Sequence, residues 1–495
     1  MHYFKRLFFT VAFIFPLLSL GACSTNPATG KQSFTAFMSM EKEREVGANE
    51  HPKIVERFGG IYQDEDLNFY VARIGAKLAK FSEMPNLEFT FTVLNDEKVN
   101  AFALPGGYVY VTRGLLAIVA DEAELAGVLA HEIGHITARH SSQRYSATKA
   151  TNIGIQVLGV IGSIAGAPTG ASQLASLGGQ AALKSYSREQ ELEADMLGMR
   201  YLSRAEYDPS AMTNFFYKLK AHSRLVADMR GRKNQSEYTG IMSTHPLTSE
   251  RISKAKKLAF QTKATGKEKG RDTYSIKIDG LVFGDDPKQG IRRGRTFEHP
   301  ALGIRFEVPP GFIMFNTPQK LIARSNDGSV IFFDMGPGNK IHKLGGITDY
   351  IRAINFKGRK FQDVKNLTIN GMKGVTGIAR LVIGGKQRVA RLLVIKKKQN
   401  QFFRLLFETD FNHMDLMTLN FERTVFSFKR LSQNEILAIK PMRIRHKTVS
   451  SGDSVKKIAK QIPIEGFALE WFELLNAIKR ETPLKPGQRI RTIAE

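Results

Sequence analysis

Cysteine is almost absent from this chain, since Cys23 is the only one in 495 residues. A disulfide within one chain is therefore excluded.

Long apolar runs are missing as well. Residues 7–20 are too short for an ordinary membrane span. Residues 153–183 are rich in small and aliphatic side chains, but they are interrupted at 167–170 and fall short of the roughly 20 continuous apolar residues that a span requires.

Acidic residues are too few to balance the basic ones. The chain has 47 Asp+Glu against 72 Lys+Arg, a formal net charge of +25. From residue 266 onward there are 42 Lys+Arg against 22 Asp+Glu, so most of the excess lies in the second half. A basic half of this kind favours anionic lipid headgroups or cell-wall polymers as partners. A solvated basic surface without a dedicated ligand is the alternative.

The N-terminus reads as a processing signal. A basic pair precedes the apolar residues 7–20, and Leu20-Gly21-Ala22-Cys23 resembles the lipobox of bacterial lipoproteins. The resemblance implies removal of residues 1–22 and acylation of Cys23, which gives stable membrane anchoring. Ser24 at the next position implies sorting to the outer membrane, on its periplasmic face. Nucleic acid is then excluded as a partner, because the protein lies outside the cytoplasm.

His131-Glu132-Ile133-Gly134-His135 has the spacing of a catalytic zinc site. Asp121 is a plausible helix cap, and apolar residues follow it at helical intervals. Residues four apart lie on one face of a helix, so His131 and His135 can bind one metal ion. Glu132 lies beside them, where it is free to act on a water bound to the metal.

A second segment supplies further candidate ligands. Ser187 is a plausible N-cap, and Glu191 and Asp195, four residues apart, face the same way on the helix that follows it. A hydrolytic zinc site takes three protein ligands and leaves one position open, so we expect Glu191 to be the third ligand. Asp195 is then expected to orient a ligand imidazole. Glu193 points about 200° away from Glu191, so we expect it to be solvated or in a surface pair.

Together these motifs resemble the HtpX-like clan of zinc metallopeptidases, which includes the CaaX-prenyl proteases. HEIGH is followed by E-x-x-x-D, residues 100–107 match the NAFALPGG stretch of that clan, and residues 243–246 with 251–252 match its S/T-H-P and R-I segment. Residues 23–30 resemble the start of its periplasmic lipoprotein members. The resemblance covers about residues 23–262 and implies a zincin-type domain, mainly α-helical with a small β-sheet edge.

The resemblance also implies an activity. One zinc ion per chain would lower the pKa of a water and polarise a peptide carbonyl, with Glu132 as general base. The implied substrates are misfolded or stalled envelope proteins. His245 is expected either to swing onto the metal or to donate a hydrogen bond to the tetrahedral intermediate, unless it is only a structural loop residue. Arg251 is expected to pair with an acidic residue such as Asp195.

A substrate-binding edge is expected just before the zinc helix. Residues 87–93 and 108–112 read as strands, and between them lies the segment that begins Asn100-Ala101-Phe102-Ala103. An extended peptide that pairs with this edge would have its scissile carbonyl over the metal. An ordinary hairpin with a Pro-Gly-Gly turn is the alternative.

The domain boundaries follow from composition. We expect a tether at 23–38, the peptidase domain at 39–262 and a linker at 263–300 that contains a hairpin at 274–283. Strand and helix patterns at 301–435 predict an α+β accessory domain on an antiparallel sheet, without a second catalytic cluster. Residues 440–495 resemble a βααβ LysM-type module, which implies binding of peptidoglycan or, alternatively, a structural cap. Residues 153–183 are expected to form a pair of small-residue helices against the zinc helix.

Two functions compete with that of a peptidase. The chain could be a chaperone or scaffold in outer-membrane protein assembly, with a mostly closed zinc site. It could also be a lipoprotein that binds the cell wall through residues 440–495.

Overall fold

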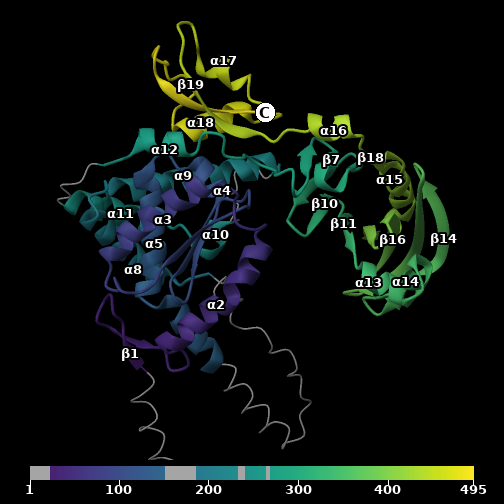
Figure 1. The fold of residues 1–495 in the computed structure, drawn as a ribbon, viewed down its shortest axis with the longest axis horizontal. Coiled ribbons are helices and arrows are strands. Elements are labelled where there is room, and N and C mark those ends of the chain that lie inside the picture. The colour runs from purple at the N-terminus through teal and green to yellow at the C-terminus, as the bar shows by residue number, and fades with distance from the viewer. Residues whose placement is uncertain (1–22, 151–184, 232–239, 263–267) are drawn as a thin grey trace, which may run out of the picture. The chain divides into compact units, whose positions relative to one another are not determined.

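The computed structural model describes residues 23–150, 185–231, 240–262 and 268–495. The chain divides into two compact units, one formed by residues up to 281 together with 443–494, and the other by residues 282–442 (Figure 1). Within the described residues, no helix is both long enough and apolar enough to span a bilayer. The expected signal peptide at 1–22 and the expected helices at 153–183 lie outside the described residues.

The first unit is mainly helical, as expected. Its helices up to the motif are α2 (Met40–Arg57), α3 (Glu65–Lys80), α4 (Arg113–Ile118) and α5 (Glu122–Thr137). They are followed by α8 (Arg188–Arg204), α9 (Ser210–Met229), α10 (Ile241–Thr244), α11 (Ser249–Gln261) and α12 (Arg271–Lys277). Every residue of α5 is buried, because α3, α8 and α9 all pack against it. Asp121 caps α5 by accepting a hydrogen bond from the backbone N–H of Glu124.

Two glycines allow α5 and α8 to approach closely. A Cβ atom at Gly134 would lie 3.0 Å from the carbonyl oxygen of Ala194, and one at Gly198 would lie 3.0 Å from the backbone nitrogen of His131. Both distances are tighter than ordinary side-chain contacts, so a larger residue at either position would separate the helices. The short helix–helix distance therefore depends on glycine at these two sites. It brings the HEIGH segment of α5 next to the first turn of α8.

A small sheet precedes α5, with β5 (Tyr108–Thr112) in its centre. Strand β3 (Thr90–Leu94) pairs with β5 in parallel, and β4 (Ala101–Leu104) pairs with it antiparallel. The segment predicted to bind substrate therefore forms an edge strand of the sheet. Strand β4 also packs against α5.

The expected tether is instead a hairpin that docks on this unit. Strands β1 (Cys23–Thr25) and β2 (Gln32–Phe34) are antiparallel. The Asn26 side-chain amide donates to the carbonyl of Ala138 over 3.1 Å, and the Arg139 guanidinium donates to the Ser24 hydroxyl over 3.0 Å. Both Ala138 and Arg139 directly follow α5. Polar side chains from a distant part of the chain thus order residues that composition alone suggested were a spacer.

The expected hairpin at 274–283 is wrong, because this segment begins with helix α12. Tyr274 and Ile278 are four apart and both fully buried, as on one helix face. The Tyr274 hydroxyl donates to the carbonyl of Leu116 over 2.6 Å. Residues 271–277 therefore belong to the first unit rather than to a linker.

The chain returns to the first unit after residue 442. Strands β19 (Arg443–Thr448) and β20 (Arg489–Ala494) pair antiparallel around α17 (Val455–Ala459) and α18 (Ala468–Asn476), in the expected βααβ order. The Arg491 guanidinium is buried and donates to the carbonyls of Val119 and Ala120, directly before the cap of α5. The C-terminal segment is thus attached close to the start of the helix that carries HEIGH.

The second unit is an α+β fold on a large antiparallel sheet, which confirms the expectation for this region. The sheet has the order β14-β15-β16-β17-β11-β10-β9. Its strands are β9 (Phe312–Asn316), β10 (Lys320–Ser325), β11 (Val330–Gly336), β14 (Gln362–Ile369), β15 (Met372–Ile383), β16 (Lys386–Lys398) and β17 (Gln401–Asp410). Of these, β9 and β14 were not predicted.

Helices cover both faces of the large sheet. Helix α15 (Met414–Ser427) packs on the face that presents Phe403 and Phe407. Helices α13 (Gly338–Lys343) and α14 (Ile347–Ala353) pack on the face that presents Val375 and Phe402. The remaining elements are the strands β6 (Ile291–Arg293), β7 (Thr296–His299), β8 (Ile304–Glu307), β12 (Asn355–Phe356), β13 (Arg359–Lys360) and β18 (Lys429–Arg430), and helix α16 (Gln433–Ala438).

Candidate metal centre

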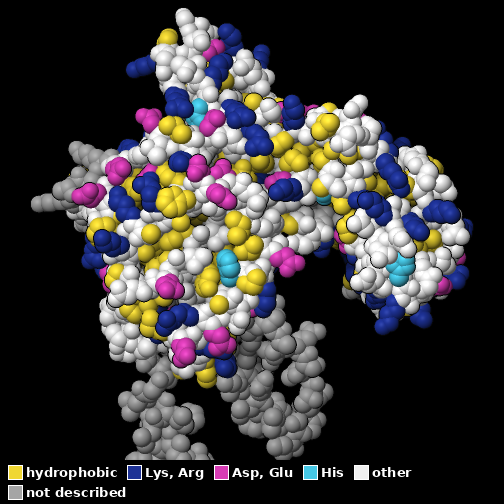
Figure 2. All heavy atoms as spheres, in the orientation of Figure 1, with side chains coloured by type: hydrophobic (Ala, Val, Ile, Leu, Met, Phe, Trp, Pro, Cys, Tyr) yellow, Lys and Arg dark blue, Asp and Glu magenta, His cyan; other side chains and the backbone are white. Residues whose placement is uncertain are grey.

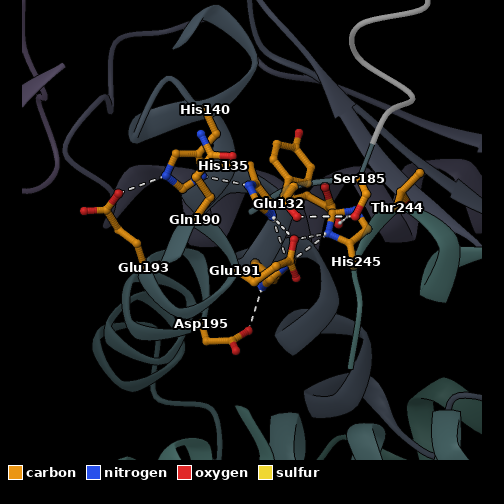
Figure 3. A network of polar contacts seen from close by, with 12 residues as sticks. Glu132, His135, His140, Ser185, Gln190, Glu191, Glu193, Asp195, Thr244 and His245 are labelled. Atoms are coloured by element: carbon orange, nitrogen blue, oxygen red, sulfur yellow. Dashed lines mark hydrogen bonds and ion pairs between the residues drawn. The ribbon is translucent and has the colours of Figure 1, made fainter. Parts of the chain in front are cut away.

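Three segments far apart in the sequence supply one buried cluster (Figure 3). Helix α5 contributes His131 and His135, helix α8 contributes Glu191, and the residue directly after α10 is His245. One donor atom from each of these four side chains lies within 4.8 Å of all the others. All four side chains are buried.

The distances between neighbouring donor atoms suit the corners of a tetrahedral zinc site. The Nε2 atoms of His131 and His135 are 3.0 Å apart, and His135 Nε2 is 3.3 Å from Glu191 Oε1. Tetrahedral Zn–N and Zn–O bonds of 2.0–2.1 Å place neighbouring ligand atoms about 3.3 Å apart. Two imidazole nitrogens facing each other at this distance repel unless a cation or a proton lies between them. The donor set therefore fits a divalent metal.

His245 takes the fourth corner. Its Nδ1 atom is 3.0 Å from Glu191 Oε1 and 3.3 Å from His131 Nε2, again close to the tetrahedral edge. Its other ring nitrogen lies 3.5 Å from Glu132 Oε1. A cavity of only about 20 Å³ adjoins Glu132, enough for about one water molecule. The structure thus shows a closed arrangement, in which a side chain lies where a hydrolytic site holds water.

The carboxylates of the cluster are tuned by their neighbours. Burial alone would raise the pKa of Glu191, but His245 and Arg251 outweigh it and hold that pKa well below its usual value. Glu191 is therefore an anion, as a metal ligand must be. Burial raises the pKa of Glu132 above its usual value, which suits a group that accepts a proton and later returns it.

Asp195 and Arg251 support the His131 ligand. The Nδ1 atom of His131 is 2.9 Å from Asp195 Oδ1, so its Nε2 atom is left for a metal. The Arg251 guanidinium donates two hydrogen bonds of 2.7 Å to Asp195 and also contacts Glu191. Burial favours the neutral form of Asp195, but Arg251 outweighs it and keeps the pKa of that carboxyl below its usual value.

A different pair of residues supports the second ligand, His135. Its Nδ1 atom is 2.8 Å from Nδ1 of His140, and Nε2 of His140 is 2.9 Å from Glu193 Oε2. Burial lowers the pKa of both imidazoles, so both are neutral. In a consistent placement of the protons, the Nδ1–H of His135 donates to Nδ1 of His140, and the Nε2–H of His140 donates to Glu193. Glu193, expected to be solvated or in a surface pair, lies 3.7 Å from the exposed Lys31 Nζ and also accepts from His140, which follows α5 in the sequence.

One further side chain beside the cluster had no signal in the sequence. The ring of Tyr186 stacks on that of His135, with centroids 3.7 Å apart and planes 19° apart. The Tyr186 backbone N–H donates to the carbonyl of Thr244, the residue before His245. Tyr186 therefore contacts one ligand and holds the loop that carries another.

The predicted substrate edge is closed in this structure. Asn100, Ala101, Phe102 and Ala103 are all buried, with Asn100 the most exposed at 8%. Ahead of them, the Val99 carbonyl accepts a hydrogen bond from the N–H of Ile241, at the start of α10. A backbone hydrogen bond therefore connects the residue before the edge strand segment to the segment that leads to His245.

A helix with HExxH and a glutamate from a second helix define a class of zinc-dependent metallopeptidases. Within that class, residues 65–259 match the model of Peptidase family M48. The fit of the cluster to one ion agrees with the zinc dependence of M48 metalloproteases, so the expected cofactor is confirmed.

Several curated proteins are similar to about half of this chain. The chain is 32% identical over 258 residues to the beta-barrel assembly-enhancing protease of Yersinia pestis, covering 51% of each chain. It is 30% identical to the Escherichia coli K12 protein of that name, covering 45% of each. It is 27% identical to the mitochondrial metalloendopeptidase OMA1 of Schizosaccharomyces pombe, covering 46% of this chain and 64% of the other. The chain thus spans about half the length of its bacterial relatives.

Proposed function

We propose that this chain is a zinc-dependent metalloendopeptidase of the bacterial envelope. The observation that carries the proposal is that donor atoms of His131, His135 and Glu191 lie within 4.8 Å of one another, with Glu132 beside them. The three are the ligands, and the relatives that share this segment are named as proteases.

Each side chain has one task in the reaction. Zinc, when bound, supplies a Lewis acid that lowers the pKa of a water and polarises the scissile carbonyl. Glu132 accepts the proton and passes it to the leaving amine, as its raised pKa permits. Asp195 and Arg251 hold the His131 ring, while His140 and Glu193 hold the His135 ring. His245 has to leave its corner before water and substrate can enter.

The location and substrates follow from the N-terminus and the relatives. Acylated Cys23 would anchor the chain to the periplasmic face of the outer membrane. Two of the relatives are named for enhancing β-barrel assembly, which supports misassembled envelope proteins as substrates and the assembly machinery as a partner. Residues 100–103 would bind the extended substrate once the edge opens. Residues 301–435 would serve as a docking domain, and the LysM-like residues 440–495 as a peptidoglycan-binding module or a structural cap.

The experiment that tests the proposal is Glu132→Gln. The variant should retain one zinc ion per chain by elemental analysis but lose cleavage of casein, because the amide cannot accept the proton. Glu41→Gln, an exposed residue in the first turn of α2, is the matched control and should cleave as the wild type does. Casein cleavage by Glu132→Gln at the wild-type rate would refute the assignment of the general base.

A second function is favoured by the closed fourth corner. If His245 stays on the metal throughout, the chain would act as a scaffold in outer-membrane protein assembly rather than as a protease. Glu132→Gln separates the two, since a scaffold would keep its cellular role in this variant and a protease would not.

A further inference from the structure

Residues 351–400 in the second unit are unusually basic. They contain 13 Lys+Arg and one acidic residue, Asp363. Most of this stretch forms β14, β15 and β16 of the large sheet. In Figure 2, Lys and Arg side chains gather along the rim of this unit below α13 and α14. A sheet with this composition is stable only if its cations are solvated, paired or neutralised by a ligand.

Five cations meet at one end of the sheet. Gly374 of β15 pairs with Ile395 of β16 in an antiparallel arrangement. Lys373, just before Gly374, and Lys396, just after Ile395, therefore lie at the same end of the sheet. The pairing of β16 with β17 shifts between Lys396 and Lys398, which is where Lys397 lies. The Arg430 guanidinium donates to the Lys397 carbonyl over 3.3 Å.

These five side chains line a cavity of about 470 Å³ that contains no carboxylate. Among the residues that the structure describes, none of the five has a carboxylate oxygen within 4 Å. Burial together with the charges of Lys398 and Arg430 lowers the pKa of Lys397. Some cations elsewhere in the unit are paired, as Arg404 is with Asp334 over 2.6 Å. This end of the sheet therefore carries five positive charges without a neighbouring carboxylate among the described residues.

An apolar cavity continues from the basic one. It measures about 710 Å³, shares Lys373 and Lys396 with the basic cavity, and lies between the α13–α14 segment and the sheet. Its apolar lining comes from Ile347, Leu367 and Phe402, among others. A ligand that fills both cavities would be anionic at one end and apolar at the other.

An exposed aromatic side chain lies close to the basic cavity. Phe426, near the end of α15, is 69% exposed. Its backbone carbonyl accepts a hydrogen bond of 3.1 Å from the side chain of Asn370, whose neighbour Gly371 lines the basic cavity. Exposed aromatic residues beside clustered cations are typical of surfaces that contact the headgroup region of a membrane.

We propose that this end of the second unit binds an anionic phospholipid. The lipid phosphate would lie among Lys373, Lys396, Lys397, Lys398 and Arg430, and an acyl chain would extend into the apolar cavity under α13 and α14. Phe426 would lie at the membrane interface. This site is separate from the acyl group expected on Cys23, and it gives the second unit a lipid contact of its own.

The test uses the full-length protein in a zwitterionic detergent and short-chain lipids. Binding of dihexanoyl phosphatidylglycerol is compared with that of dihexanoyl phosphatidylcholine by native mass spectrometry. The anionic lipid should bind at least tenfold more tightly. The double variant Lys396→Gln/Lys398→Gln should bind it about 25-fold more weakly, since each cation near a lipid surface contributes a factor of about five. Equal binding of the two lipids, or unchanged binding by the double variant, would overturn the proposal.

Two controls identify the source of the effect. Lys365→Gln/Lys386→Gln removes two exposed charges from other parts of the sheet and should bind the anionic lipid within twofold of the wild type. Inorganic phosphate and glycerophosphoglycerol, which carries the headgroup without acyl chains, should both bind at least tenfold more weakly than the lipid. If either binds as tightly as the lipid, the site is a phosphate site and the apolar cavity is not part of it.

Discussion

Removing the His140 imidazole should weaken zinc binding although His140 is not a ligand. In His140→Ala the Nδ1–H of His135 loses its acceptor, while its Nε2 atom still faces the cluster. A buried N–H without a partner costs about 1–3 kcal/mol. That range corresponds to a loss of roughly 5- to 150-fold in affinity, in line with the 10- to 100-fold typical of residues that orient a ligand imidazole.

The assay is a competition for zinc against a chromophoric chelator at neutral pH. His140→Gln offers an amide oxygen as a replacement acceptor and should recover part of the lost affinity. His413→Ala, in the second unit, is the matched control and should bind zinc as the wild type does. The reasoning is refuted if folded His140→Ala binds zinc as tightly as the wild type. A loss that His140→Gln does not reduce would show that packing, rather than the hydrogen bond, is responsible.

Three other changes have definite expected outcomes. His245→Ala should open the fourth corner and raise the rate of casein cleavage; a lower rate would mean that His245 acts on the intermediate instead. Arg251→Met should lower the free energy of unfolding in urea by about 3–5 kcal/mol, because it removes the guanidinium that neutralises the buried carboxylates of Glu191 and Asp195. Burial beside Trp471 lowers the pKa of His222 to about 4, from 6.5 in the unfolded chain. Above pH 6.5 this imidazole is neutral in both states and does not affect stability. As the pH falls from 6.5 to 4, the unfolded chain binds a proton that the folded protein does not, and the free energy of unfolding falls by up to about 3 kcal/mol in total. His222→Gln should remove this part of the pH dependence of thermal unfolding, and an unchanged slope would contradict it.

The parts of the site that lie on single helices could be predicted from the sequence. The spacing of His131 and His135 is fixed by helix geometry, and so is that of Glu191 and Asp195. No local pattern relates α5 to α8, so the two pairs were brought together by the need of a hydrolytic zinc site for a third ligand, and the family resemblance agreed with this. His140 and Tyr186 were missed because each acts through a contact that exists only after folding.

Segments that pack on distant parts of the chain were predicted least well. Composition marked the residues after Cys23 as a spacer and residues 274–283 as a hairpin. The structure orders both through side chains whose partners are about a hundred or more residues away, as for Asn26 with Ala138 and Tyr274 with Leu116. The return of residues 443–494 to the first unit likewise depends on Arg491, which nothing in its neighbourhood distinguishes from the many other basic residues.

If Cys23 carries the proposed acyl chains, the docked hairpin at β1 and β2 would limit the distance between the first unit and a bilayer. Asn26 is hydrogen-bonded to the residue that follows the HExxH helix and comes three residues after Cys23, a span of at most about 10 Å. With the proposed acyl chains on Cys23, that end of the helix would be held beside the lipid headgroups. Proteins accessible to the zinc would then be those that arrive at the membrane surface, such as partly inserted chains, while those farther out in the periplasm would be beyond reach.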